Sequence, residues 1–154
     1  MDNSIHDILS LKNQLCFPLY AAARQTIKLY TPYLDELGLT YTQYITMELL
    51  WERRTMTVKE LGEELFLDSG TLTPLLKKLE SKGYITRARS CLDERHLIVS
   101  LTEEGDALSQ EAKRIFCGKG RCDRLTVEES AMLHCLLYKL LGRPEAPAPD
   151  WADQ

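Results

Sequence analysis

The 154-residue chain lacks any apolar run of the roughly 18 residues that a membrane-spanning helix needs. Its first residues, MDNSIHDILS, carry acidic side chains and lack the basic, apolar and small-residue regions of a signal peptide. Internal repeats and low-complexity domains are also missing. We therefore expect a cytoplasmic protein with no membrane partner, folded as one globular domain around a core drawn from its 44% hydrophobic residues.

The chain also lacks an even set of cysteines, because it has five. An odd number in a reducing compartment argues against a structural disulfide framework and leaves free thiols, a metal site or a redox switch. Cys16 lies in the stretch KNQLCFPLY, between Leu15 and Phe17. Apolar neighbours are typical of a cysteine that fills a core, so this pattern alone leaves packing and chemistry both open.

The chain also lacks a net positive charge. The formal net charge of −4 argues weakly against a nucleic-acid partner, but the charge is unevenly distributed. Residues 68–96 hold six basic and four acidic side chains, whereas the rest of the chain holds 13 basic and 19 acidic ones. The basic excess is therefore local to this segment.

Helix signals dominate what is present, and we expect only two strands. A first helical region spans about residues 10–30, where Pro18 predicts a kink or a fresh start near Cys16 and Pro32 predicts the end. Capping residues predict further helices at 40–53, from 57, at 68–83, from 102 towards 116, and from 126 to 141. Segments 84–89 and 96–101 have the pattern of two strands joined by a polar turn. The predicted fold class is mainly α with a small β-hairpin wing, a winged helix-turn-helix.

The predicted helix at 68–83 has one hydrophobic face, because Leu72, Leu75, Leu76 and Leu79 follow helical spacing. Its other side begins with small hydroxyl residues that can approach a DNA groove closely, and continues with two lysines that can reach phosphates. These predicted DNA-binding residues are Ser69, Thr71, Thr73, Lys77 and Lys78. The solvated face of an ordinary amphipathic helix explains the same pattern equally well.

The predicted hairpin favours DNA binding. Arg95, at the turn, can enter the narrow minor groove, and Asp93 can orient its guanidinium through a bidentate pair. A surface ion pair of little energetic value is the alternative. Arg87, on the first strand, completes the predicted DNA-binding set.

The segment MTVKELGEELFLDSGTLTPLLKKLESKGYITRARSCLDERHLIVSLTEEG resembles the winged-helix core of MarR-type transcriptional regulators. The strings DSGTLTPLLKKLE and DER…VSLTEEG are specific, and QLCF.LY, Tyr30 and LTYTQY narrow the resemblance to the organic-hydroperoxide-sensing repressors, the OhrR branch. It covers about residues 10–140. It implies a single domain at 1–142, with a winged helix at about 40–102 between N- and C-terminal dimerisation helices at about 4–34 and 103–142. Residues 143–154 are expected to form a flexible tail.

The resemblance implies a transcriptional repressor, not an enzyme, that binds a pseudo-palindromic double-stranded DNA operator and needs no cofactor. Oxidation of Cys16 by an organic hydroperoxide would release the operator. In that family, tyrosines matching Tyr30 and Tyr41 approach the thiolate from the partner subunit of a homodimer and hydrogen-bond to it. Two-cysteine members resolve the oxidised thiol with a cysteine just before the last helix. Cys122 fits that position better than Cys117, but the presence of both leaves the resolving residue open.

Three other interpretations remain. A thiol peroxidase built on Cys16 would require a thioredoxin-like α/β pattern, which the sequence lacks. A zinc site could use Cys117, Cys122, His134 and Cys135, although adjacent residues of one helix cannot easily bind one ion. A MarR-type regulator that responds to a small aromatic ligand would use Cys16 only as pocket lining. Cys91 has no evident role in any of them.

Overall fold

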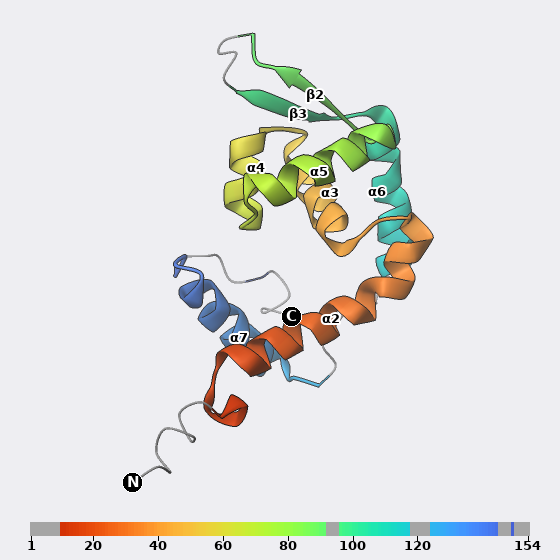
Figure 1. The fold of residues 1–154 in the computed structure, drawn as a ribbon. Coiled ribbons are helices and arrows are strands. Elements are labelled where there is room, and N and C mark those ends of the chain that lie inside the picture. The colour runs from red at the N-terminus through yellow and green to blue at the C-terminus, as the bar shows by residue number, and fades with distance from the viewer. Residues whose placement is uncertain (1–9, 92–95, 118–123, 145–148, 150–154) are drawn as a thin grey trace. The chain divides into compact units, whose positions relative to one another are not determined.

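The computed structural model describes residues 10–91, 96–117, 124–144 and 149 (Figure 1). The chain divides into two compact units, residues 1–119 and 120–154. The first unit contains a short 3₁₀ helix η1, helices α2 to α6 and strands β1 to β3, and the second contains α7. In chain order the elements are η1 (Leu11–Asn13), α2 (Cys16–Leu37), α3 (Tyr41–Arg53), β1 (Thr55–Thr57), α4 (Val58–Leu65), α5 (Ser69–Ser81), β2 (Ile85–Arg89), β3 (Leu97–Leu101), α6 (Glu103–Phe116) and α7 (Val127–Leu140).

Helix α2 begins at Cys16, which confirms the fresh start predicted from Pro18, but the prediction that Pro32 ends the helix is wrong. The helix continues through Pro32 to Leu37. An interior proline costs about 3 kcal/mol. Leu34 and Leu37 lie beyond it, and they are only 3% and 4% exposed. Burying two leucines stabilises the fold by roughly 1.5–3 kcal/mol each, which outweighs the proline.

The helix starts predicted from capping residues are confirmed. Asp68 and Thr102 accept hydrogen bonds from backbone N–H groups of α5 and α6. Reciprocal capping boxes, in which each partner's side chain accepts from the other's backbone N–H, open the three remaining helices: Thr40 with Gln43, Thr57 with Glu60, and Thr126 with Glu129. None of the helices in the described part of the chain is long and apolar enough to cross a membrane.

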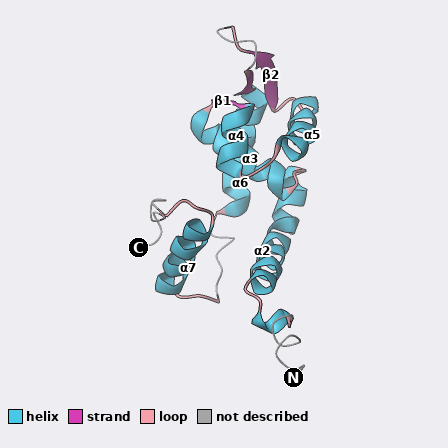
Figure 2. Cartoon of the chain, turned by 60° about the vertical axis from the view of Figure 1, so that its left-hand side comes forward, coloured by secondary structure: helices cyan, strands magenta, loops and turns pink. Residues whose placement is uncertain are grey.

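The two predicted strands are confirmed as β2 and β3, but the expectation of only two strands is wrong, because Thr55–Thr57 forms β1 (Figure 2). The sheet is antiparallel, in the order β1-β3-β2. Met56 of β1 lies opposite Val99 of β3, and both are buried. A three-residue strand is too short to show alternation in the sequence. It nevertheless fixes the hairpin to the hydrophobic core.

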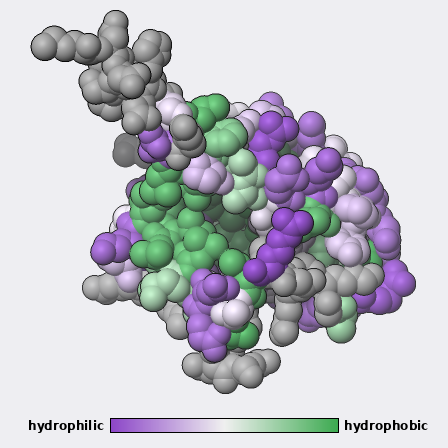
Figure 3. Space-filling view, turned by 90° about the horizontal axis from the view of Figure 1, so that it is seen from below, coloured by the Kyte–Doolittle hydropathy of each residue, from purple (hydrophilic) through white to green (hydrophobic). Residues whose placement is uncertain are grey.

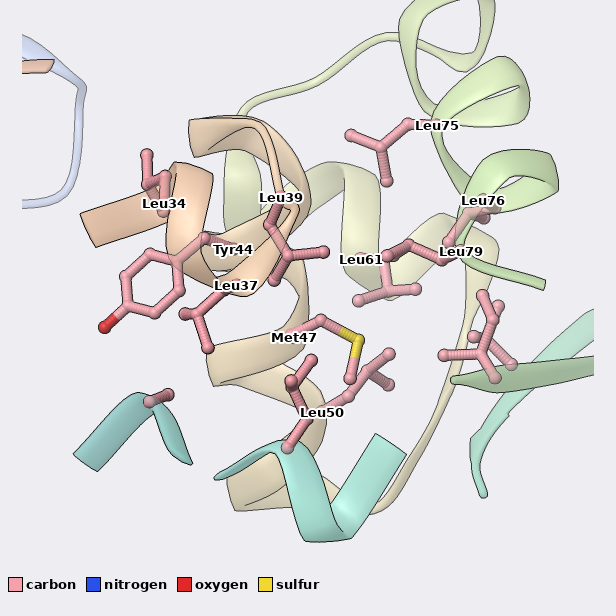
Figure 4. Close-up of a cluster of buried hydrophobic side chains, with 14 of the residues drawn as sticks. Leu34, Leu37, Leu39, Tyr44, Met47, Leu50, Leu61, Leu75, Leu76 and Leu79 are labelled. Atoms are coloured by element: carbon pink, nitrogen blue, oxygen red, sulfur yellow. The ribbon is translucent and has the colours of Figure 1, made fainter. Parts of the chain in front are cut away.

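The core lies between the helices of the winged part (Figure 4). Met47 and Leu50 of α3 and Leu61 of α4 are fully buried, and they pack with the predicted hydrophobic face of α5. That face is confirmed, since its four leucines are at most 6% exposed: Leu72, Leu75, Leu76 and Leu79. Burial of one side of α5 leaves its opposite side available to a partner.

Candidate nucleic-acid interface and thiol site

The outward side of α5 carries the five residues predicted to bind DNA, and all five are exposed: Ser69, Thr71, Thr73, Lys77 and Lys78. Asp68 organises the start of the helix, because its carboxylate accepts from the backbone N–H of Thr71 at 2.9 Å and from the Thr71 hydroxyl at 3.1 Å. The same hydrogen bonds from Thr71 hold the pKa of Asp68 below its ordinary value. The exposed helix start therefore presents backbone N–H groups and hydroxyls, and ammonium groups follow a little over two turns later.

The wing strands β2 and β3 lie beside this helix (Figure 1). The wing residues that the sequence predicted to bind DNA differ in their environments. Arg87 is directed towards Glu80 of α5, with Nη2 2.5 Å from Oε2, and its side chain is only 18% exposed. Its guanidinium thus already has an anionic partner within the protein. Asp93 and Arg95, predicted for the wing tip, lie outside the described residues.

Cys16 is the first residue of α2 and is exposed, so it does not fill the core of this chain. The positive end of a helix dipole favours an anion such as a thiolate. Hydrophobic side chains surround it in the sequence and are also exposed, Leu15 at 73%, Phe17 at 45% and Tyr20 at 58%. Exposed hydrophobic side chains gather on the face shown in Figure 3.

Tyr30 and Tyr41, the two tyrosines predicted to stabilise the Cys16 thiolate, contact each other. Their ring centroids are 5.6 Å apart in an edge-to-face arrangement. Cys16 and Tyr30, however, lie on the same helix α2, fourteen residues apart. At about 1.5 Å per residue this separation is roughly 21 Å. A Cys16 thiol therefore cannot reach the tyrosine pair of its own chain, and only a second copy can bring these groups together.

Phe116 is a central residue of the aromatic cluster that the sequence interpretation missed. It is the last residue of α6, and its ring centroid lies 5.7 Å from Tyr30, 5.7 Å from Tyr33 and 4.7 Å from Tyr44. Helical spacing from the buried Leu108 would have placed it on the inner side of α6. The residue that follows it is Cys117, which is exposed. Phe116 therefore contacts Tyr30 and directly precedes Cys117, one of the two candidate resolving residues.

Tyr44 also hydrogen-bonds within the cluster, donating its hydroxyl to Glu48 Oε1 at 2.6 Å. Partial withdrawal from water raises the pKa of Glu48, although the hydrogen bond from Tyr44 opposes this. Burial, followed by the nearby Glu48 charge, raises the pKa of Tyr41, and burial together with Glu48 also raises that of Tyr44. Both phenols therefore remain protonated at neutral pH, so that Tyr41 keeps a hydroxyl proton to donate while Tyr44 donates to Glu48.

A pocket of about 660 Å³ opens between α3 and α6 beside this cluster. Its lining combines aromatic and charged side chains, among them Tyr44, Glu48, Trp51, Lys113 and Phe116. In the part of the chain that is described, no three His, Cys, Asp or Glu side chains are grouped to hold a metal ion. Cys122, named for the zinc alternative and for thiol resolution, lies outside the described residues.

Comparison of this chain with protein families and characterised relatives shows that it is similar to transcriptional regulators. A family model described as the transcriptional regulator SarA/Rot matches residues 28–112. The organic hydroperoxide resistance transcriptional regulator of Bacillus subtilis is 48% identical over 141 residues, which are 92% of this chain and 95% of that protein. The HTH-type transcriptional regulator SarZ of Staphylococcus epidermidis is 50% identical over 110 residues, 69% of this chain and 74% of the relative.

Solved structures give the same result. Reduced AbfR bound to DNA is 35% identical with a TM-score of 0.74, over 86% of this chain and 93% of that one. AbfR, a Staphylococcus epidermidis protein, is also known in a disulfide-formed state, with a TM-score of 0.63. A mutant MarR from E. coli in complex with operator DNA is 26% identical with a TM-score of 0.77, over 91% and 99% of the two chains. The chain therefore belongs to the MarR-type winged-helix transcriptional regulators, in their organic-hydroperoxide (OhrR) branch.

Proposed function

We propose that this protein is a DNA-binding transcriptional repressor that senses organic hydroperoxides through Cys16 and releases its operator when that residue is oxidised. One observation carries the proposal. Cys16 is exposed at the start of α2 among apolar side chains, and the tyrosine pair that would hold its thiolate can meet it only across a dimer. The proposed site of action is the cytoplasm, and no cofactor is required.

The proposed DNA-binding surface is the exposed side of α5 together with the wing. Reduced AbfR and MarR have been solved with DNA, and this chain has their fold. The five outward residues of α5 would enter a major groove, where hydroxyls reach base edges and lysines reach phosphates. Arg95, which the sequence predicts at the turn of the wing, is proposed to enter the adjacent minor groove with its guanidinium oriented by Asp93.

The proposed assembly is a two-fold homodimer. Large hydrophobic side chains are exposed on α2, including Phe17, Ile27 and Leu29, at 39–63%. In the second unit, α7 has no buried residue and exposes a row of its own: Met132, Leu133, Leu136 and Leu140. Two-fold pairing would bury such surfaces and place two α5 helices on a pseudo-palindromic operator, one DNA turn apart.

The proposed chemistry is a two-electron oxidation. The Cys16 thiolate attacks the terminal oxygen of the hydroperoxide, so that an S–O bond forms, the O–O bond breaks and the substrate leaves as an alcohol after taking up a proton. The thiolate of Cys122, or alternatively of Cys117, then attacks the sulfenic sulfur and displaces hydroxide, which leaves as water. The two electrons that the thiols lose reduce the O–O bond of the hydroperoxide, whose oxygen atoms leave in the alcohol and the water. Loss of the thiolate also removes the anion held by Tyr30 and Tyr41.

A second candidate function rests on the pocket between α3 and α6. Its volume of about 660 Å³ and its Trp51, Phe116 and Lys113 lining suit a small aromatic acid. In that case the protein would respond to a ligand, and Cys16 would be dispensable for the response.

The deciding experiment is a gel-shift titration of reduced protein on operator DNA with cumene hydroperoxide, followed by dithiothreitol. Wild type should release DNA at stoichiometric peroxide and bind it again after reduction. A 100-fold loss of affinity requires only about 2.7 kcal/mol of difference between the two states. Cys16→Ser should bind DNA and ignore peroxide, whereas Cys135→Ser, which removes another exposed cysteine, should behave as wild type.

Release of DNA by Cys16→Ser at the wild-type peroxide dose would overturn the sensor proposal. The same samples distinguish a sensor from a peroxidase, because a sensor consumes about one peroxide per Cys16. With dithiothreitol present, peroxide consumption much faster than the recovery of DNA binding after reduction would indicate an enzyme instead.

A further inference from the structure

We propose that Glu80 is a positioning residue for DNA recognition, whose carboxylate binds Arg87 and thereby fixes the wing to the end of the recognition helix α5. The inference deepens the proposed DNA-binding function and rests on it. It also gives Arg87 a role different from the direct DNA contact expected from the sequence.

The contact is built from three hydrogen bonds between the same two residues. The backbone N–H of Arg87 donates to Glu80 Oε1 at 3.1 Å. The Arg87 side chain donates to Oε2 from Nε at 3.0 Å and from Nη2 at 2.5 Å. A single carboxylate therefore holds both the main chain and the side chain of one β2 residue. Charge-assisted pairs of this kind are about twice as strong as neutral hydrogen bonds and are geometrically specific.

The position of Arg87 in its strand explains why it needs this partner. Side chains two residues apart in a strand point to the same face. Ile85 is 1% exposed, so Arg87 follows it on the side of β2 that faces the protein. The Arg87 side chain is 18% exposed, whereas that of Glu80 is 37% exposed. An arginine placed to contact phosphate would present its guanidinium to solvent, whereas this guanidinium is largely enclosed and neutralised.

The connection between α5 and β2 supplies the second fixed point. Gly83, with φ 78°, donates to the Glu80 carbonyl at 2.9 Å, and Tyr84 donates to the Leu79 carbonyl at 3.1 Å. This pair of bonds is the Schellman arrangement that ends a helix. Thr102 Oγ1 donates to the Gly83 carbonyl at 2.6 Å and holds the turn from the α6 side. The turn sets where β2 begins but leaves its direction to contacts further along the strand.

Beside the pairing of β1 with β3, Glu80 supplies the contact that ties β2 to α5, four residues after the turn. Arg87 is paired with Val99 in the sheet, so β3 moves together with β2. The hairpin stays closed beyond this point, because the Ser90 N–H donates to the His96 carbonyl at 2.9 Å. Pivoting of β2 about Gly83 would displace the wing tip relative to the outward side of α5. DNA binding needs both surfaces at once, so a preset angle improves affinity without contacting DNA.

The experiment measures DNA affinity by fluorescence anisotropy, using full-length reduced protein and a duplex selected from random DNA by the wild type. Affinities are recorded between about 50 and 200 mM salt, because the slope of log K against log salt counts phosphate contacts. Glu80→Gln should weaken binding about 10-fold with an unchanged slope. Arg87→Lys, which keeps the charge but loses the planar fork, should weaken it similarly, again with an unchanged slope.

A phosphate-contacting Arg87 predicts the opposite pattern. Glu80→Gln would free the guanidinium and tighten binding, and Arg87→Met would lower the slope by about 1. Either result would overturn the positioning role. Glu111→Gln, which breaks the exposed pair with Arg114 on α6, is the matched control and should leave affinity unchanged. Thermal unfolding of each variant establishes that it is folded, and failure of the wild type to select any duplex would overturn the DNA-binding proposal itself.

Discussion

At the residue scale, two glutamates of this chain have opposite pKa shifts because their surroundings differ. Hydrogen bonds from Arg87 lower the pKa of Glu80. Partial withdrawal from water raises the pKa of Glu48, and the hydrogen bond from Tyr44 opposes that rise without cancelling it. The folded state therefore favours the charged form of Glu80 and disfavours the charged form of Glu48.

We predict that Glu48→Gln raises thermal stability at neutral pH relative to wild type. A carboxyl whose folded pKa is raised binds more protons when folded, so its contribution to stability falls as pH rises from about 4.3 through the raised value. The amide removes this contribution and still accepts from Tyr44. Melting temperatures across pH should therefore show a gain near pH 7 that closes in acid.

We predict that Glu80→Gln changes the melting temperature in the opposite direction. A carboxyl group whose pKa is lowered by folding stabilises the protein at pH values above its unfolded pKa. That stabilisation is lost as the pH falls through the folded pKa. Glu80→Gln should thus lower the melting temperature near pH 7 and match wild type in acid.

A Glu48→Gln protein that is less stable than wild type at every pH would contradict the cause assigned to the raised pKa of Glu48.

The site residues differ in how far the sequence could predict them. Cys16, Tyr30 and Tyr41 follow from a family resemblance, and the structure brings the two tyrosines into contact. The pairing of Glu80 with Arg87 joins a helix to a strand, and local periodicity carries no information about which elements meet. Phe116 could have been assigned to the inner side of α6 by spacing, but not to its three tyrosine partners.

At the element scale, sequence signals located helix starts well and failed where tertiary burial decided the outcome. The caps at Thr40, Thr57 and Asp68 act through hydrogen bonds to residues three positions on, so the sequence contains both partners. Pro32 did not end α2, and β1 formed from only three residues. Both outcomes depend on burial against distant parts of the chain, which no local pattern reports.

The start of α6 gives an element-scale prediction at Gly105. A Cβ placed there would lie 2.1 Å from the Tyr84 carbonyl oxygen, and the Gly105 carbonyl accepts from Trp51 Nε1 at 2.7 Å. Gly105→Ala should therefore push α6 away from the α5–β2 turn and destabilise the protein by about 1–3 kcal/mol. Denaturant unfolding measures the loss. Glu104→Ala, at an exposed position of the same turn, should be nearly neutral, and equal stability of the two variants would contradict the close packing.

At the scale of the whole molecule, hydrophobic surface is distributed unlike that of an ordinary monomer. The winged part buries its leucines, whereas α2 and α7 leave large hydrophobic side chains open in their own units. Contiguous exposed apolar surface of this kind typically marks an interface. The thiol and the tyrosines on α2 and α3 also need a second copy to meet. The proposed assembly and the proposed thiol site would therefore both use α2.

We predict a dimer at micromolar concentration. Sedimentation equilibrium should give twice the chain mass, independent of the presence of DNA. Leu136→Glu, a charge on the exposed row of α7, should shift the protein towards monomer, because burying an unpaired carboxylate is costly. Glu128→Gln, at an exposed position of the same helix, should leave the dimer intact. A wild-type monomer would contradict both the assembly and the shared thiol site.

The oxidised state gives the last prediction, a disulfide between subunits. Bonded cysteines need Cα atoms about 4.4–6.8 Å apart. Cys117 follows Phe116, whose ring lies 5.7 Å from that of Tyr30, and Tyr30 is some 21 Å along α2 from Cys16 of the same chain. Because Cys16 lies some 21 Å along α2 from the tyrosine that Phe116 contacts, we expect a disulfide between Cys16 and Cys117 to join two chains.

Stoichiometric cumene hydroperoxide should accordingly convert wild type into a covalent dimer on a non-reducing gel, and dithiothreitol should reverse it. Cys122→Ser should abolish the covalent dimer and stop at a sulfenic acid or a mixed disulfide, whereas Cys117→Ser should still form it. The reverse result would assign resolution to Cys117. A disulfide pulling Cys16 of one subunit onto the other would shift the two winged parts relative to each other and change the spacing of their α5 helices, which is how oxidation would weaken operator binding. Mass spectrometry that finds the disulfide within a single chain would contradict this route.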